Sequence, residues 1–336
     1  MSRKSTPARP LRIGLVGCGR ISRAHVAGYR QAGGARIVRV FDANPTAAAA
    51  LAQETGAAVA DSLAALAQPA EVDAVSICTP PAFHLEHGRL FVRAGIPVLC
   101  EKPLAANLAD AQKLAALVGR RRALFMAGFC HRFHPPIRAL RELLRRGRLG
   151  KPLVFRVTFA GQFPLTGDHR ANARLAGGGC LADNGAHAVD LFRFLIGEVA
   201  TVQAQTGHLV QPAAVEDYAA LLWRGRDGCV GEFVTGYSFP QAENTVTIWC
   251  ANGVVTVNYG VPNRPELVYQ LAGETTEHVV NVKSTPDRFT TEVKHFLDCV
   301  RTGNQPSVTA ADGLAAVKII TAAYRAAQTG RAVKLR

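Results

Sequence analysis

The 336-residue chain lacks the features that would mark a metalloprotein, a disulfide-stabilised domain or a membrane protein. Its eight cysteines form no Cys-x-x-Cys pair, so the sequence supports neither a zinc ribbon nor a disulfide framework. No apolar stretch approaches the ~20 residues that span a bilayer. Residues 1–10 are basic, but no apolar signal-peptide core follows them. We therefore expect a flexible tail over residues 1–10, a cytoplasmic protein and no membrane partner.

Acidic residues are comparatively scarce, because 25 Asp and Glu stand against 39 Lys and Arg, a formal net charge of +14. Such an excess raises the question of nucleic-acid binding. The arginines are dispersed, however, and the densest groups, residues 120–122 and 138–148, fall at a helix end and along an amphipathic helix. No basic motif with interleaved aromatic residues occurs. We expect solvated helix faces, no nucleic-acid partner, and a positive field that favours an anionic cofactor.

Alternating apolar and helical segments fill the chain up to residue 133. Short apolar runs occur at residues 11–16, 36–41, 57–60, 74–78, 97–100 and 124–128. Alanine-rich helical segments such as 45–55 and 108–118 lie between them. Strands that are apolar on both faces and alternate with helices are typical of a parallel sheet covered on both sides. The pattern predicts a doubly wound, Rossmann-type α/β domain over residues 11–133.

The pattern changes in the second half of the chain. After a helix at 136–146, β-forming residues cluster at 153–159, 218–223, 229–235 and 245–249. The dipeptides Asp227-Gly228 and Asn252-Gly253 favour tight antiparallel hairpins. Helical segments at 286–301 and 310–328 follow. We predict an α+β domain with a mainly antiparallel sheet over residues 134–336.

A glycine-rich turn follows the first predicted strand. Gly17 and Gly19 allow a tight turn whose backbone N–H groups approach a pyrophosphate closely, and the next helix offers its N-terminus to that anion. Ser22 replaces the third glycine of the usual pattern, a position that mainly requires a small residue. A glycine-rich turn without a ligand is the alternative interpretation. The flanking strand and helix favour a dinucleotide site.

Asp42 closes the second apolar run, where a carboxylate can accept hydrogen bonds from an adenosine ribose. A carboxylate there would repel the 2′-phosphate of NADP, so the sequence predicts NAD as the cofactor. Arg20 and Arg39 are near enough in sequence to leave NADP open.

Polar residues also follow two later strands of the predicted parallel sheet. Thr79-Pro80 comes after one strand and Glu101-Lys102-Pro103 after the next. The carboxyl ends of such strands form the edge at which ligands bind. A surface turn closed by a salt bridge is the alternative for the Glu-Lys pair.

Asp183 and His187 follow three glycines, at residues 177–179, on a predicted helix. Four positions apart, they share one helix face. A carboxylate beside an imidazole fixes its tautomer and raises its basicity, as a general base requires. The alternative is that Asp183 caps the helix and His187 is a buried structural histidine.

Together these segments resemble the Gfo/Idh/MocA family of nicotinamide-dependent oxidoreductases, named for glucose–fructose oxidoreductase and inositol dehydrogenase. The resemblance covers nearly the whole chain, and its Glu-Lys-Pro and Asp-x-x-x-His segments are quite specific. It is carried by Gly17-x-Gly19-Arg20-Ile21, Thr79-Pro80 with His84, residues 94–103, Arg132-Phe133, Gly178-Gly179 with Asp183, His187 and Asp190, and residues 329–333.

The resemblance implies that Lys102, Asp183 and His187 are the catalytic residues. In such enzymes hydride passes between a carbinol carbon of the substrate and C4 of the nicotinamide. His187 would take the hydroxyl proton, Asp183 would orient His187, and Lys102 would stabilise the developing alkoxide. The Lys102–Pro103 bond is often cis in this family.

The same resemblance assigns cofactor and substrate contacts, and no metal ion is required. One departure is Cys130-His131-Arg132-Phe133, where the family often has Asn-Arg-Arg-Phe. His131 and the loop 167–170 could therefore shape the substrate pocket, and the alternative is a surface loop and a solvated histidine. The residues implied for the cofactor are Gly17, Gly19, Arg20, Ile21, Asp42, Thr79, Pro80, His84, Glu101, Lys102 and Arg132. Those implied for substrate are Lys102, His131, His169, Arg170, Asp183, His187 and Tyr237.

The implied activity is an NAD(P)-dependent dehydrogenase acting on a secondary alcohol of a sugar, cyclitol or sugar derivative. One alternative is a glycosidase of the same family that uses NAD transiently, oxidising and re-reducing the sugar around an elimination. A non-catalytic, nucleotide-sensing regulator is a third hypothesis. The family also implies that the large C-terminal sheet is open-faced, that its domain binds substrate, and that a homodimer or homotetramer forms through this sheet.

Overall fold

The computed structural model describes residues 9–260, 264–283 and 285–335. Residues 1–8 of the predicted tail therefore lie outside the described residues. Within these ranges, no helix is long and apolar enough to cross a bilayer. The described residues form two compact units, and the predicted division at residues 133 and 134 stays a prediction. Unit 1 comprises Met1–Glu101, Lys113–Gly128 and Phe289–Ala310, and unit 2 comprises Lys102–Gln112, Phe129–Arg288 and Ala311–Arg336.

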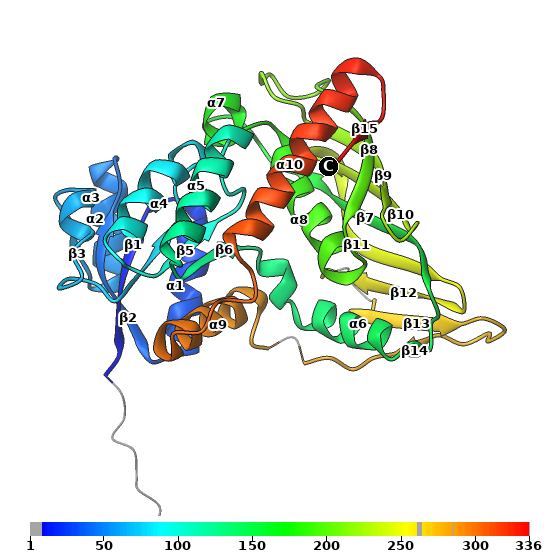
Figure 1. Ribbon diagram of the computed structural model, residues 1–336, viewed down its shortest axis with the longest axis horizontal. Coiled ribbons are helices and arrows are strands. Elements are labelled where there is room, and N and C mark those ends of the chain that lie inside the picture. The colour runs from blue at the N-terminus through cyan, green and yellow to red at the C-terminus, as the bar shows by residue number, and fades with distance from the viewer. Residues whose placement is uncertain (1–8, 261–263, 284, 336) are drawn as a thin grey trace, which may run out of the picture. The chain divides into compact units, whose positions relative to one another are not determined.

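Unit 1 contains a six-stranded parallel sheet with the strand order β3-β2-β1-β4-β5-β6 (Figure 1). This order, with its reversal between β1 and β4, confirms the doubly wound prediction. Every residue of β4, β5 and β6 is buried, which explains why the sequence shows continuous apolar runs there rather than alternation. The strands are β1 (Leu11–Val16), β2 (Ala35–Phe41), β3 (Ala58–Val59), β4 (Ala74–Ile77), β5 (Val98–Glu101) and β6 (Phe125–Gly128).

Helices connect the strands of this sheet. Helix α2 begins where the Asn44 side chain accepts hydrogen bonds from two backbone N–H groups, and it ends at Gly56 in the left-handed conformation. The late helix α9 packs closely against α1. A Cβ atom added to Gly28 of α1 would lie only 3.0 Å from the side chain of Val293 in α9. The helices are α1 (Arg20–Ala32), α2 (Pro45–Thr55), α3 (Leu63–Leu66), α4 (His84–Arg93), α5 (Leu108–Arg121) and α9 (Arg288–Thr302), with the 3₁₀ turn η1 (Pro81–Phe83).

Unit 2 contains a nine-stranded sheet with the order β14-β13-β12-β11-β7-β10-β9-β8-β15. All its pairs are antiparallel except β7 with β10, which confirms the predicted, mainly antiparallel sheet. Hairpins form at both predicted turns, Asp227-Gly228 and Asn252-Gly253. The strands are β7 (Pro152–Gln162), β8 (Val199–Gly207), β9 (Tyr218–Gly225), β10 (Val230–Gly236), β11 (Ser238–Cys250), β12 (Gly253–Asn258), β13 (Leu267–Leu271), β14 (His278–Val279) and β15 (Val333–Lys334).

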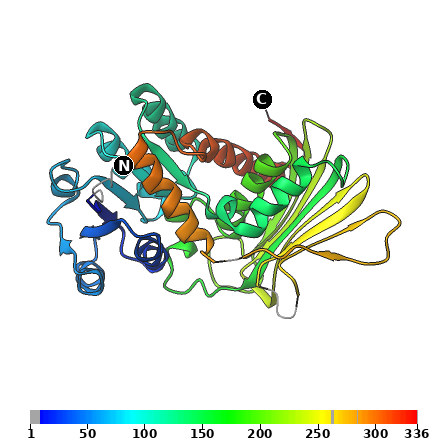
Figure 2. The same cartoon turned by 90° about the horizontal axis from the view of Figure 1, so that it is seen from below.

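Helix α8 (Cys180–Leu195) packs on one face of this sheet, and helix α10 (Ala310–Thr329) packs on α8. Figure 2 shows helices on one face of the sheet of unit 2, with the other face bare. Burial alternates residue by residue along β9, as a sheet covered on one side requires. The core between α8 and the sheet holds edge-to-face aromatic pairs, with Phe192 between Phe155 and Trp223. Unit 2 also contains α6 (Pro135–Arg145), α7 (Ala173–Ala176), η2 (Cys130–Phe133) and η3 (His169–Ala171).

Candidate active site

The glycine-rich turn of unit 1 has the geometry of a dinucleotide-binding loop. Gly17 has a φ of +91°, and a Cβ atom on it would lie 2.7 Å from the backbone of Cys78, so a side chain is excluded. A Cβ atom on Gly19 would meet nothing within 4 Å, which leaves space for a ligand beside the N-terminus of α1. Among the described residues, no side chain caps that N-terminus, and its first residues are Arg20 and Ile21. The residues present fit a pyrophosphate bound by the backbone N–H groups of this turn.

Ser22, which replaces the third glycine, is fully buried under this loop. Its hydroxyl donates a 2.6 Å hydrogen bond to the carbonyl oxygen of Gly19. Ser22 is therefore small enough for the close packing that this position requires, and its hydroxyl also stabilises the turn.

Asp42 lies beside the same loop, at the end of β2. One of its carboxylate oxygens accepts a 2.6 Å hydrogen bond from the Cys18 backbone N–H, and the other accepts one from Asn44. Arg39, one of the two arginines that left NADP open, is held by Glu71 through hydrogen bonds of 2.8 and 2.6 Å. The Asp42 carboxylate is thus held in place beside the loop, and Arg39 is already paired with Glu71. This arrangement favours NAD over NADP.

Hydrogen bonds to helix α4 hold the chain after β4. The Nε2 atom of His84 donates to the Thr79 carbonyl oxygen at 2.8 Å, and the Thr79 hydroxyl lies 3.1 Å from Nδ1 of His87. Pro80 begins the η1 turn between them. Thr79, Pro80 and His84 therefore form one local structure at the carboxyl edge of the parallel sheet, and their contact with the cofactor stays a prediction.

Glu101, the last residue of β5, belongs to a buried polar network that the sequence analysis did not identify. Its carboxylate lies 3.0 Å from Nε2 of His25, whose Nδ1 lies 3.2 Å from the hydroxyl of Ser76. Burial alone would lower the pKa of His25. The interactions of its ring with Cys78 and with the Glu101 carboxylate outweigh burial and raise the pKa to about 10. The pair joins helix α1 to the strand end that precedes Lys102. The hydrophobic periodicity of the sequence could not predict this network, because its residues come from two separate strands and a helix.

Lys102, in unit 2, forms an ion pair with Asp183 of α8, and the Lys102–Pro103 peptide bond is cis, as the family resemblance implied. The other carboxylate oxygen of Asp183 accepts hydrogen bonds from Arg170 at 2.9 Å and from Tyr237 at 2.8 Å. Burial alone would raise the pKa of Asp183, but Lys102 and Arg170 hold it well below its usual range. The structure thus brings three of the predicted site residues together around the ionised carboxylate of a fourth, Asp183.

The loop before α8 orients Arg170. Asp168 accepts hydrogen bonds from the backbone and the guanidinium of Arg170, and it lies 3.2 Å from Nδ1 of His169. Burial and the positive charge of Arg170 lower the pKa of His169, so its ring is neutral near pH 7.

His187 does not form the expected pair with Asp183. Within the described part of the chain, no hydrogen bond joins the two side chains, and Nδ1 of His187 is buried without a partner. The carboxylate turns instead to Lys102, Arg170 and Tyr237, because two cations and a hydroxyl outweigh a neutral ring. His187 packs against His131, with ring centroids 4.2 Å apart. Helical spacing placed both residues on one face but could not decide between competing partners.

Arg132 makes contacts that differ from the predicted cofactor contact. Its guanidinium donates hydrogen bonds of 2.8 and 2.6 Å to Asp190 and one of 3.1 Å to Asp312. Arg132 is 8% exposed and Asp190 is 1% exposed, so this is a buried ion pair between η2 and the helices. A contact between Arg132 and the cofactor stays a prediction.

The start of α8 depends on Glu216, which the sequence analysis missed. Its carboxylate accepts hydrogen bonds from the backbone N–H groups of Gly179 and Leu181 and from the hydroxyl of Tyr324. A carboxylate is favourable at a helix N-terminus. A Cβ atom on Gly179 would lie 2.0 Å from the Glu216 backbone oxygen, so the glycine is required there. This cap comes from another part of the chain, and no local capping motif could reveal it.

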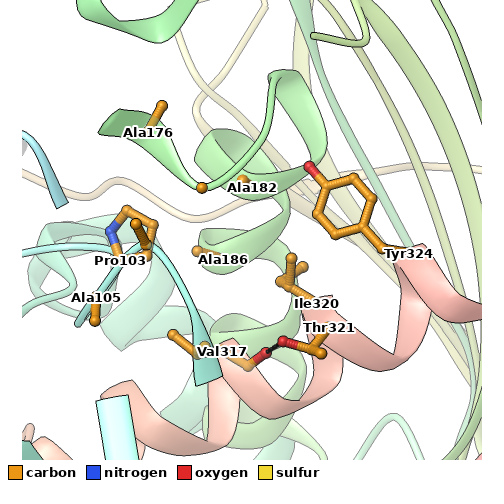
Figure 3. A pocket seen from close by; sticks show the side chains of 11 residues that line it. Pro103, Ala105, Ala176, Ala182, Ala186, Val317, Ile320, Thr321 and Tyr324 are labelled. Carbon is orange, nitrogen blue, oxygen red and sulfur yellow. Dashed lines mark hydrogen bonds between the residues drawn. The ribbon is translucent and has the colours of Figure 1, made fainter. Parts of the chain in front are cut away.

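Figure 3 shows Pro103 facing Ala182 and Ala186 of α8, with Ile320 and Tyr324 of α10 nearby. These side chains line an apolar cavity of about 40 Å³. The cavity is too small for a sugar. It lies where the segment that carries Lys102 packs against the helix that carries Asp183.

Two protein-family models match this chain. One family model, an oxidoreductase family with an NAD-binding Rossmann fold, matches residues 11–129, and the Gfo/Idh/MocA C-terminal domain model matches residues 137–256. A D-apiose dehydrogenase from Paraburkholderia graminis is 28% identical, over 100% of this chain and 92% of that protein. An inositol 2-dehydrogenase from Rhizobium meliloti is also 28% identical, over 97% of this chain and 99% of that protein.

A solved structure shares the fold across both units. It is a levoglucosan dehydrogenase in complex with NADH and levoglucosan, with a TM-score of 0.89 and 22% identity over 98% of this chain and 100% of that one. The two family models together cover most of the chain, and the glycine-rich loop of unit 1 fits a dinucleotide. The chain therefore belongs to the Gfo/Idh/MocA family of NAD-binding oxidoreductases.

Proposed function

We propose that the protein is an NAD-dependent dehydrogenase that transfers hydride between the nicotinamide and a secondary alcohol of a sugar, cyclitol or sugar derivative. The observation that carries the proposal is the ion pair between Lys102 and Asp183 on the helix that also bears the buried His187. The named relatives support the substrate class, since they are dehydrogenases of a sugar and of a cyclitol.

Each side chain has a distinct role in this proposal. The ammonium group of Lys102 stabilises the alkoxide that develops on the substrate. His187 takes the hydroxyl proton, since its neutral ring has a free nitrogen lone pair. Asp183 positions Lys102, and Arg170 and Tyr237 in turn hold Asp183. The bound nicotinamide supplies the hydride acceptor.

A substrate panel tests the proposal. Sugars, inositols and sugar nucleotides are incubated with NAD and then with NADP, and the absorbance of the reduced nicotinamide is followed while released aglycone is assayed in the same wells. We expect NADH formation that His187→Gln abolishes. Glycoside cleavage without net NADH would replace the proposal with the NAD-recycling glycosidase. NAD binding without turnover of any substrate would favour the regulator.

The Asp42 carboxylate is expected to set the cofactor preference. In Asp42→Ala, hydrogen bonds to a charged group worth about 1.5–3 kcal/mol are lost, which corresponds to a ~10- to 100-fold loss in kcat/KM with NAD. The loss with NADP is expected to be smaller, because the repulsion of the 2′-phosphate disappears. Steady-state kinetics with both cofactors measure the ratio, with the exposed Asp61→Ala as the control. An unchanged ratio would contradict this assignment.

The pH dependence of the reaction is expected to follow His187. Burial, together with the positive charges of Lys102 and Arg288, lowers the pKa of His187 well below 6.5. The ring therefore stays in its proton-accepting form as the pH falls through 6.5, and protonation removes activity only at lower pH. A pH profile of kcat/KM should show its acid limb below pH 6.5. A limb at or above pH 6.5 would exclude His187 as the titrating base.

The open face of the sheet in unit 2 supports the proposal of a homodimer or homotetramer. Leu222 and Trp249 are 50% and 37% exposed, which leaves large apolar side chains uncovered there. Light scattering should give a mass above the 35.8 kDa of one chain. A mass of one chain at working concentration would refute the proposal.

A further inference from the structure

Three metal-ligating side chains of unit 2 converge where η2 meets α8. Cys130, His131 and His187 each offer one ligand atom, and these atoms all lie within 4.8 Å of one another. The reaction proposed above uses His187 but has no role for the thiol of Cys130. The third ligand comes from α8, far along the chain, so no local spacing of ligand residues indicates this cluster in the sequence.

Two of the ring nitrogens here have no hydrogen-bond partner. The Nδ1 atoms of His131 and of His187 are both buried and unsatisfied. A buried polar atom without a hydrogen-bond partner destabilises the fold, so this cluster is arranged to gain a ligand. Aromatic rings surround it, with Phe159 and Tyr259 each 5.1 Å from the ring centroid of His131.

One thiolate and two imidazoles are a ligand set typical of Zn²⁺. Ligand distances of about 2.0–2.3 Å in a tetrahedral site place ligand atoms roughly 3.3–3.7 Å apart. Side-chain rotations that move the ligand atoms by about 1 Å therefore bring them to these separations around an ion. A fourth coordination position remains for water. The thiol of Cys130 must lose its proton on binding, and the thiolate offsets the positive charge of nearby Lys102.

We propose that Cys130, His131 and His187 form an inhibitory binding site for a divalent cation of the Zn²⁺ class. The ion takes the lone pair with which His187 would accept the substrate proton, so binding and turnover exclude each other. Binding follows from the cluster alone, and only the inhibition rests on the proposed function.

Cobalt tests the binding without any substrate. Co²⁺ is titrated into the purified full-length protein, and we expect tetrahedral d–d bands together with a thiolate-to-cobalt charge-transfer band, all of which Zn²⁺ removes. Cys130→Ser should lose the charge-transfer band, and His131→Gln and His187→Gln should each weaken binding at least ~10-fold. Cys229→Ser and His134→Gln, at buried positions outside the cluster, serve as matched controls and should change neither. A charge-transfer band that persists in Cys130→Ser would overturn the site.

X-ray absorption at the zinc edge of the wild-type protein keeps the test independent of any variant that fails to fold. The expected first shell contains one sulfur and two imidazole nitrogens, and a shell without sulfur would refute the proposal. Inhibition is then measured with the substrate found in the panel. Zn²⁺ should inhibit the wild type reversibly, with recovery on adding EDTA, and should spare Cys130→Ser. Metal binding without inhibition would refute the inhibitory role, whereas full activity in His187→Gln would instead refute the proposed function.

Discussion

Replacing Lys102 with methionine is expected to lower kcat about 10²- to 10³-fold. Methionine keeps the apolar stem but removes the ammonium group, so the alkoxide loses its positive partner. Arg170 and Tyr237 still hold the other oxygen of Asp183, which keeps the carboxylate hydrogen-bonded and the helix in place. Steady-state kinetics give kcat, and calorimetric titration gives the dissociation constant for NAD. The loss is expected mainly in kcat, because charge develops on the substrate in the transition state.

Two further variants separate charge from packing at this position. Lys151→Met removes a lysine that is exposed at the start of β7 and should leave kcat unchanged. Lys102→Arg keeps the charge but changes its shape and reach, so an intermediate rate is expected. If Lys102→Met retained the wild-type kcat, the ammonium group would have no electrostatic role, and the Lys102–Asp183 pair would be structural.

The dinucleotide loop was predictable because every part of its signal is local. Gly17, Gly19 and Asp42 each follow a short apolar run, and the chemistry of a phosphate turn depends on the residues in that turn. The structure adds only what a pattern cannot give, such as the hydrogen bond from the Ser22 hydroxyl to the Gly19 carbonyl. Continuous apolar runs likewise sufficed for β4 to β6, because strands buried on both faces have no other composition available.

The contacts of Asp183 were not predictable from its position on the helix. Helical periodicity identified Asp183 and His187 as neighbours on one face, which is correct for the backbone. The partners that Asp183 selects come from Arg170 in a loop and Tyr237 after β10, and their reach depends on the tertiary fold. The same holds for Glu216, which caps α8 from a distant segment. Local patterns therefore selected the residues of the candidate site, whose catalytic roles stay a prediction, and the fold decides how these residues pair.

Replacing Arg132 with methionine is expected to lower the free energy of unfolding by about 3–5 kcal/mol. The change leaves the carboxylate of Asp190, which is 1% exposed, without its two hydrogen bonds to the guanidinium. Burial already raises the pKa of Asp190 to about 6, and losing Arg132 removes a group that lowers it. Because this folded pKa exceeds the unfolded value of 3.8, the unpaired charge destabilises the variant most above its folded pKa. Urea denaturation at several pH values should show the loss in free energy of unfolding shrink as the pH falls through the pKa of Asp190 in the folded variant.

The double variant Arg132→Met with Asp190→Leu removes both charges and should recover most of the lost stability, since no unpaired carboxylate remains in the core. A double variant as unstable as Arg132→Met would show that lost packing, and not the buried charge, is the cause. The same protein tests the predicted cofactor contact of Arg132. If Arg132 contacts NAD, the restored fold will still bind the cofactor weakly. If the guanidinium serves only Asp190 and Asp312, the affinity for NAD will return with the stability, because the ion pair acts through the fold and not on the ligand.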